Sequence, residues 1–157
     1  MKQLNQHRLD ELTHAARQSP RLRMNANLHD ALDEPVQRLA IAMQPDTIIR
    51  PHRHQQTWEL LLPLRGRFVV LHFDEAGQVT DRVVLGVDSQ VQETPAGCYH
   101  AVLSLDDGGV IFEVKHGPYR PFVPEDFAPG YRDDNPARDA RLNAWYATAQ
   151  IGDRLWS

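Results

Sequence analysis

Four side chains with the chemistry of metal ligands occur in two separate segments of the chain. His52 and His54 stand two residues apart, and Glu59 follows five residues after His54. His100 comes from a distant segment, just after a Pro-Ala-Gly turn. Three neutral imidazoles and one carboxylate suit zinc, iron, nickel, copper, cobalt or manganese better than calcium or magnesium, which prefer oxygen ligands. We therefore predict one divalent transition metal (Zn, Fe, Ni or Mn) bound by these four residues.

The spacing of these residues requires strands and a turn. Side chains two apart on a strand share a face, so His52 and His54 can point to one place. Glu59 needs a turn within residues 55–57 to bring it onto a neighbouring strand that faces the same interior. Taken alone, such a histidine pair is more often solvated or structural than a metal site. The pair together with Glu59, Gly66 and the separate His100 favours a metal centre.

The rest of the pattern indicates an all-β fold with a helix at each end. Apolar residues at helical spacing predict a helix over Leu4 to Gln18, and Asn135-Pro136 predicts the start of a second over 137–150. Between them lie short alternating segments with turns every eight to twelve residues, which is typical of a sandwich or barrel. The expected strands cover residues 22–29, 36–43, 47–50, 60–64, 68–73, 79–85, 100–105 and 110–114.

Length and composition limit the number of domains and the kinds of partner that the chain can have. The 157 residues predict a single domain with an N-terminal helix (1–20), a barrel (21–117) and an irregular or helical extension (118–157). A net charge of −4 without a basic run argues against nucleic acid as a partner. We find no signal peptide, no membrane-spanning stretch and only one cysteine, Cys98, so a cytoplasmic location is expected.

These motifs resemble those of the cupin superfamily. The first cupin motif resembles His52-x-His54-x4-Glu59-x6-Gly66, and the second resembles Pro95-x-Gly97-x2-His100. Two positions depart from the usual pattern, because the first motif usually opens with a glycine where this chain has Asp46, and the second usually ends with an asparagine where it has Ser104. Neither position supplies a metal ligand. The resemblance implies a cupin double-stranded β-helix, a jelly-roll barrel, with short N- and C-terminal helices.

Within the cupins, the chain is most similar to the WbuC-type cupin-fold metalloprotein family. The similarity extends from residues 23–29, through the histidine pair, to residues 112–115 and 117–119. That family occurs in bacteria near genes for surface polysaccharide synthesis. The resemblance therefore implies the fold and a metal, suggests a sugar or nucleotide sugar as the small-molecule ligand, and makes a homodimer plausible because cupins often pair.

Other side chains are candidates for contacting such a ligand. The alternation over residues 22–29 places one set of polar residues on a single face, which either meets water or lines the barrel interior. The predicted ligand-binding residues are Arg23, Asn25, Asn27, His29 and Arg50. The candidate general acids or bases are His29, Lys115 and Tyr119.

This pattern is compatible with three functions. A metal-dependent enzyme could perform isomerase-, epimerase- or oxygenase-like chemistry, since four protein ligands leave coordination positions for a substrate. The alternative is a non-catalytic, metal-stabilised sugar-binding or regulatory module. The third is a barrel that has lost its metal, which the presence of all four ligand residues disfavours. An open cavity beside the metal, lined by Asn25, Asn27 and arginines, would favour catalysis, whereas bulky side chains filling it would favour a structural role.

Overall fold

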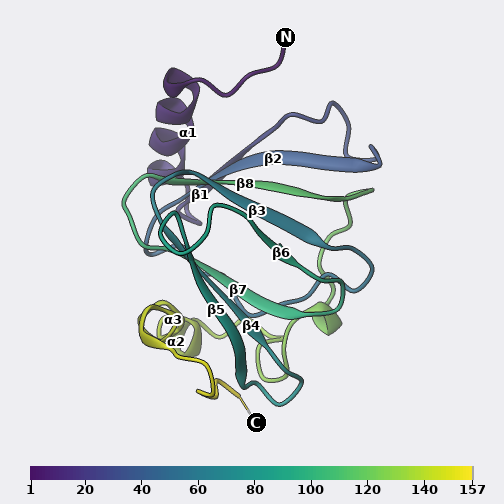
Figure 1. The fold of residues 1–157 in the computed structure, drawn as a ribbon, viewed down its shortest axis with the longest axis vertical. Helices are drawn as coiled ribbons and strands as arrows, with labels where there is room; N and C mark the ends of the chain where they lie inside the picture. Colours follow the sequence, from purple (N-terminus) through teal and green to yellow (C-terminus); the bar gives the residue numbers. More distant parts are fainter. Residues whose placement is uncertain (157) are drawn as a thin grey trace.

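The computed structural model describes residues 1–156 and consists mainly of two antiparallel β-sheets (Figure 1). Among these residues, no helix combines the length and the apolar character that crossing a membrane requires. The elements in chain order are α1 (Gln6–Gln18), β1 (Arg23–Asn27), β2 (Val36–Met43), β3 (Glu59–Arg65), β4 (Phe68–Phe73), β5 (Val79–Leu85), β6 (Gln92–Thr94), β7 (Tyr99–Ser104), β8 (Gly109–His116), the 3-10 helix η1 (Pro124–Asp126), α2 (Pro136–Asp139) and α3 (Leu142–Thr148).

The strand order shows how the chain closes into a jelly roll. One sheet has the order β1-β2-β8-β3-β6 and the other has the order β5-β4-β7. Strands distant in sequence are therefore neighbours, because β8 lies between β2 and β3 and β7 lies beside β4. This interleaving of antiparallel strands over two sheets is the jelly-roll arrangement. The predicted all-β class, with short helices at both ends, is confirmed.

Alternation along the strands divides each sheet into an inner and an outer face. In β2, Ala40 and Ala42 pack outward against α1, whereas Ile41 and Met43 face the barrel interior. In Figure 1, α1 lies beside the five-stranded sheet, and α2 and α3 lie beside the three-stranded sheet. Small residues under α1 allow the helix to approach the sheet closely. The interior between the sheets is thereby left for larger side chains and for a cavity.

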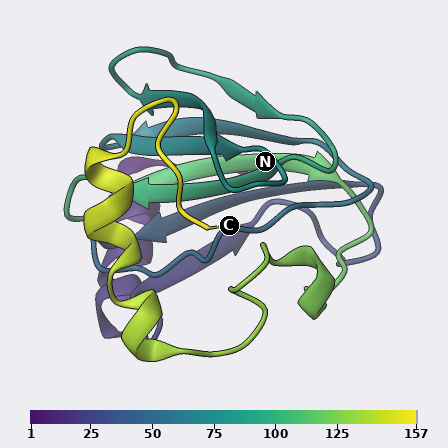
Figure 2. The same cartoon turned by 90° about the horizontal axis from the view of Figure 1, so that it is seen from below.

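The outer face of the three-stranded sheet is covered by the C-terminal extension. Buried side chains of β4 pack there against Tyr146 and Trp156. Seen from below, the chain passes from η1 along the side of the barrel before reaching α2 and α3 (Figure 2). Ser157, the last residue of the predicted extension, lies outside the described residues. The extension thus connects the region around η1 with the far side of the molecule.

Two expected elements differ from the structure. Residues 47–50 were expected to form a strand, but they pair with no neighbouring strand. Their backbone is instead bound by side chains of α3, because Asn143 donates to the Thr47 carbonyl at 3.1 Å and the Tyr146 hydroxyl donates to the Ile49 carbonyl at 3.0 Å. The single helix expected over 137–150 is divided into α2 and α3, although Asn135 does cap the first at Arg138 N.

Candidate metal centre

The histidine pair lies on an extended loop segment fixed from two sides. The backbone of His52 exchanges two hydrogen bonds with His100 of β7, at 3.0 and 2.8 Å. On the other side, Ala128 donates to the Pro51 carbonyl at 3.0 Å. A turn at residues 55–56 then reverses the chain into β3, whose first residue is Glu59. The turn expected from the spacing is therefore present, and the paired histidines sit beside the start of β7.

The four sequence-predicted ligand residues meet at one place. The nearest ligand atoms of His52, His54 and His100 all lie within 4.8 Å of one another. Glu59 contacts two of these rings, with Oε1 3.1 Å from His54 Nε2 and Oε2 3.2 Å from His100 Nε2. Two ligands bound to one ion at roughly 2.1 Å lie about 3 Å apart when the angle between them is near 90°. The two distances from Glu59 therefore suit ligands that share a single cation.

The hydrogen bonds on the outer side of two rings set their protonation. His52 Nδ1 lies 2.8 Å from the Arg50 carbonyl, and His100 Nδ1 lies 3.1 Å from the Cys98 carbonyl. Because a carbonyl only accepts, each Nδ1 donates and each Nε2 keeps its lone pair. His100 Nε2 is buried without an aligned hydrogen-bond partner among residues 1–156, although Glu59 is close. A lone pair directed at a cation would satisfy this atom, so the residues fit a metal.

The electrostatics at His52 and at Glu59 favour the forms that bind a cation. Burial, reinforced by the neighbouring His100 and His54, lowers the pKa of His52 well below its ordinary value of 6.5, which keeps this ring neutral. Burial alone would raise the pKa of Glu59, but the close contacts with the His100 and His54 rings lower it well below the ordinary value of 4.5. Burial would lower the pKa of His100, but the contact with Glu59 raises it. A neutral imidazole and an ionised carboxylate are the ligand forms that metals require.

A buried ion pair between Lys115 and Glu113 lies next to Glu59. Of this pair, only Lys115 was predicted from the sequence as a site residue. Lys115 Nζ lies 2.6 Å from Glu113 Oε1 and 3.8 Å from Glu59 Oε1. Burial, and then the charge of Glu59, raise the pKa of Glu113 to about 7. The two carboxylates raise the pKa of Lys115 despite its burial. Lys115 was a candidate from the sequence; Glu113 could have been found from its position two residues earlier on β8.

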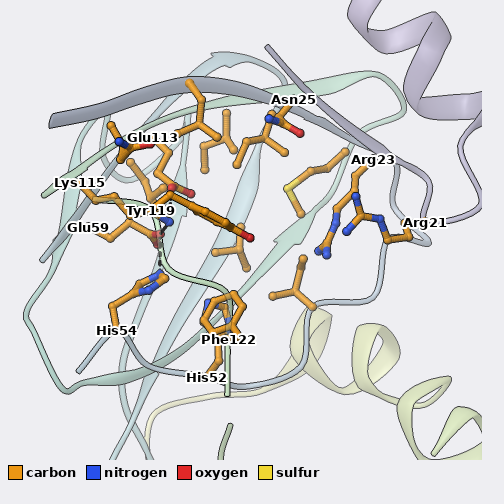
Figure 3. Close-up of a pocket in the computed structure, with 18 of the residues that line it drawn as sticks. Arg21, Arg23, Asn25, His52, His54, Glu59, Glu113, Lys115, Tyr119 and Phe122 are labelled. Atoms are coloured by element: carbon orange, nitrogen blue, oxygen red, sulfur yellow. Dashed lines mark hydrogen bonds and ion pairs between the residues drawn. The ribbon is translucent and has the colours of Figure 1, made fainter. Parts of the chain in front are cut away.

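The metal centre opens into a cavity of about 570 Å³ between the two sheets (Figure 3). His52, His54 and Glu59 line it, while His100 is fully buried behind them. The residues of the other predicted set also line this cavity: Arg23, Asn25, Asn27, His29, Arg50, Lys115 and Tyr119. The polar residues of 23–29 thus line the cavity, although Met24 of the other face lines it too and Asn25 and Asn27 are also exposed to solvent.

Three of these candidate residues differ in whether their side chains are already bonded to other groups of the protein. His29 is buried, and its Nδ1 accepts from Arg38 N at 3.0 Å, so that Nε2 carries the proton. Tyr119 is half exposed at the cavity. Arg50 is already engaged, because it donates to the Asp133 carbonyl at 2.8 Å and its guanidinium stacks over the Phe127 ring at 4.2 Å. Its charge therefore helps to hold the C-terminal extension.

Two aromatic residues of the proline-rich extension cover the histidines, and sequence reasoning missed both. The Phe122 ring lies 4.8 Å from the His52 ring and stacks on the His54 ring at 5.3 Å, measured between centroids. Phe127 contacts Phe122 at 5.4 Å. Residues 118–129 have no periodic pattern, so only their aromatic character in an irregular segment could have indicated this role. They shield one side of the site from water.

Replacing Phe122 with alanine should speed metal release without changing the metal content at saturation. Phe122 supplies no ligand atom but covers two imidazoles, so its removal admits water and chelator to the centre. Release into excess chelator, followed by absorbance, should become several-fold faster. Val123 is a matched control, since it is 48% exposed and adjacent in sequence. Equal release rates for the Phe122→Ala and Val123→Ala variants would show that Phe122 does not restrict access.

Solved structures with the same fold share little sequence with this chain, and no curated protein sequence matches it. Protein TT1209 from Thermus thermophilus has a TM-score of 0.54 and 19% identity, over 74% of this chain and 97% of that protein. An oxalate oxidase in complex with the substrate analogue glycolate has a TM-score of 0.52 and 18% identity, over 68% of this chain and 57% of that one. A cupin superfamily protein from Desulfitobacterium hafniense has a TM-score of 0.48 and 17% identity, over 60% and 76% of the two chains.

The likenesses to TT1209 and to the oxalate oxidase concern the fold alone, and they agree with the topology of the two sheets. The predicted cupin double-stranded β-helix is thereby confirmed, whereas the resemblance to the WbuC-type family stays a prediction. A family described as a domain of unknown function, DUF6016, matches residues 4–85. This match runs from α1 to β5 and includes His52, His54 and Glu59, while His100 lies beyond it. The chain thus has the cupin fold and belongs to the DUF6016 family.

Proposed function

We propose that this protein is a metal-dependent enzyme acting on a small polar or sugar-derived molecule. The observation that carries the proposal is the open cavity, in which the clustered ligand residues face arginine and asparagine side chains. Its volume of about 570 Å³ lies within the roughly 300–1,000 Å³ typical of small-molecule sites. A metal that only stabilised the barrel would need no such space. The cavity therefore favours a site that binds a small molecule over a metal with a purely structural role, and turnover decides between an enzyme and a binding module.

The residues around the cavity have separable roles in this proposal. The His52, His54, Glu59 and His100 side chains would hold the ion, which as a Lewis acid would polarise a substrate oxygen or, if it is iron, support oxygen-dependent chemistry. Phe122 and Phe127 exclude water from the imidazoles. Asn25 and Asn27 offer amide donors and acceptors on the cavity wall, which suit hydroxyl groups.

A proton donor or acceptor is available on the same side as the ligand residues. Lys115 lies 3.8 Å from Glu59 and would hold a proton at Nζ, within the buried pair that it forms with Glu113. Tyr119 would present a hydroxyl within the cavity, where its ring reaches from the side of Glu59 and Lys115 toward Arg23 (Figure 3). Such groups serve isomerisation, in which a proton leaves one carbon and returns to another, or epimerisation, in which it returns to the same carbon from the opposite face.

The substrate class and setting follow from the resemblance to the WbuC-type family. We propose a sugar or nucleotide sugar as the ligand and bacterial surface-polysaccharide metabolism as the setting, in the cytoplasm and as a homodimer. The polar wall with Asn25 and Asn27 supports a sugar-like ligand. The oligomeric state is open to a direct measurement of mass in solution, for example by light scattering after gel filtration.

Metal analysis and turnover together test the proposal. The protein, purified without a histidine tag, should contain about one transition-metal ion per chain by mass spectrometry. Sugars, sugar acids and nucleotide sugars that raise the melting temperature should then be incubated with the metal-loaded and the chelator-treated protein, and the products followed by NMR. Metal-dependent conversion of one compound supports an enzyme. Stoichiometric metal with binding but no conversion of any bound compound would favour the module instead.

A further inference from the structure

The cavity contains a second cationic region, remote from the metal centre. Arg21 and Arg23 both line it, because Arg23 begins β1 and the exposed Arg21 lies in the turn just before that strand. In Figure 3 these two side chains lie on the side of the cavity opposite Glu59, Glu113 and Lys115. We propose that Arg21 and Arg23 form an anion-binding subsite, and that the ligand carries a carboxylate or phosphate group at the end away from the metal. This proposal rests on the proposed function, whose ligand class it narrows.

The distribution of ion pairs among residues 1–156 supports the anion-binding subsite. Among residues 1–156, neither guanidinium forms an ion pair or a side-chain hydrogen bond, whereas eight other arginines form ion pairs. Arg23 is partly buried, and that burial together with the charge of Arg21 lowers its pKa. The carboxylate of Asp139 lines the same cavity but is held by Arg138 at 2.8 Å. Two adjacent guanidiniums without a counter-ion are a favourable place for an anionic oxygen group.

The backbone between the two arginines is fixed in an uncommon conformation. Leu22 has a φ of 53°, in the left-handed region that residues other than glycine rarely adopt. Its carbonyl accepts hydrogen bonds from Thr47 Oγ1 at 2.6 Å and from Gln44 N at 3.0 Å, and its N–H donates to the Ser19 carbonyl at 2.9 Å. Strain of this kind persists only where surrounding contacts maintain it, and it concentrates at functional positions. Here it holds Arg21 and Arg23 at the same cavity.

The opposite end of the cavity has a charge of the same sign once the metal is bound. A divalent ion with three neutral imidazoles and one carboxylate leaves a net charge of about +1, while Lys115 is balanced by Glu113. Between the two ends the floor is apolar and includes Ile41, Met43 and Ile111. The complementary ligand therefore has oxygen atoms for the metal, a carbon skeleton in the middle and an anionic group for the arginines. Sugar acids and sugar phosphates have this composition.

Calorimetric titration of the metal-loaded full chain tests the subsite. The probes are glucose, gluconate and glucose 6-phosphate, which differ in having no anionic group, a carboxylate or a phosphate. We expect at least one anionic probe to bind more tightly than glucose, and the Arg23→Gln variant to weaken that binding by about tenfold or more. The Arg23→Lys variant should lie between the two, because it keeps the charge but loses the bidentate geometry. The preferred probe identifies the anionic group as carboxylate or phosphate.

Controls separate this proposal from the metal proposal. Arg154→Gln removes an exposed arginine outside the cavity and should bind the probes like the wild type. Metal content is measured on the same samples, so loss of binding in Arg23→Gln at full metal content supports the subsite. Unchanged binding in Arg23→Gln, or equal affinity for all three probes in the wild type, would overturn it. Inorganic phosphate is also titrated into the His54→Ala variant. Phosphate binding to that variant that depends on the arginines supports the subsite even if no metal binds.

Discussion

The His54→Ala variant is expected to lose stoichiometric metal binding while its barrel remains folded. His54 contributes Nε2 to the cluster, where it lies 3.1 Å from Glu59 Oε1, and its side chain makes no hydrogen bond with the backbone. It stands in a loop, and its carbonyl, which accepts from Gly97 N at 2.8 Å, is retained in alanine. Loss of outer-shell partners typically costs 10- to 100-fold in metal affinity, so loss of a direct ligand should exceed roughly 100-fold.

The measurement combines metal analysis with circular dichroism. The wild type should retain about one ion per chain through dialysis, and His54→Ala should retain much less with an unchanged spectrum. His7→Ala is the matched control, since His7 is exposed on α1 and its side chain is 82% accessible. His100 is a poorer first choice because it is fully buried in β7, where truncation would also disturb the core. Equal metal content in His54→Ala and the wild type would remove His54 from the ligand set.

The Phe68→Ala variant is expected to show the largest loss of stability from a single truncation, about 3–5 kcal/mol in the free energy of unfolding. Phe68 is completely buried between the sheets, in the cluster that includes Met43 and Leu61 and forms the base of the barrel interior. Removing the ring loses its transfer free energy and leaves a space that rigid neighbouring strands cannot fill. Because small domains are stable by about 5–15 kcal/mol, this loss is a large fraction of the total.

Urea unfolding followed by fluorescence would measure this loss. Phe122→Ala deletes the same atoms from a ring that is 45% exposed, and should cost about 1 kcal/mol or less. The comparison therefore separates burial from side-chain chemistry. If the two variants had equal unfolding midpoints and slopes, Phe68 would not be part of a tightly packed interior. The contrast also separates the two roles of phenylalanine here, since Phe68 supports the barrel and Phe122 covers the site.

Local sequence patterns determined the strands that end at clear turns. The segments 36–43, 68–73 and 79–85 coincide with β2, β4 and β5, because each combines a continuous β-forming run with a clear turn at its end. The same alternation predicted a strand over residues 22–29, which coincides with β1 except at its ends. It failed for residues 47–50, since an extended segment looks the same whether its backbone pairs with a strand or with side chains of α3.

Motif spacing determined the ligand candidates, because two residues on one strand face and one residue after a tight turn are local relationships. What the sequence alone could not supply was the register between distant strands. Glu113 and Lys115 lie beside Glu59 only because β8 pairs with β3, more than fifty residues away. A pairing of that kind depends on the path of the whole chain and leaves no periodic trace near Glu59.

The tertiary structure also decided the roles of residues outside regular elements. Phe122 covers the histidines and Arg50 binds the extension, because residues 118–134 return across the barrel after β8. Arg21 was not distinguished from its neighbours by type or spacing, and it becomes a cavity residue through the left-handed conformation of Leu22. The sequence by itself thus determined which atoms can bind a metal. Only packing, in which distant segments compete for the same space, decided what surrounds them.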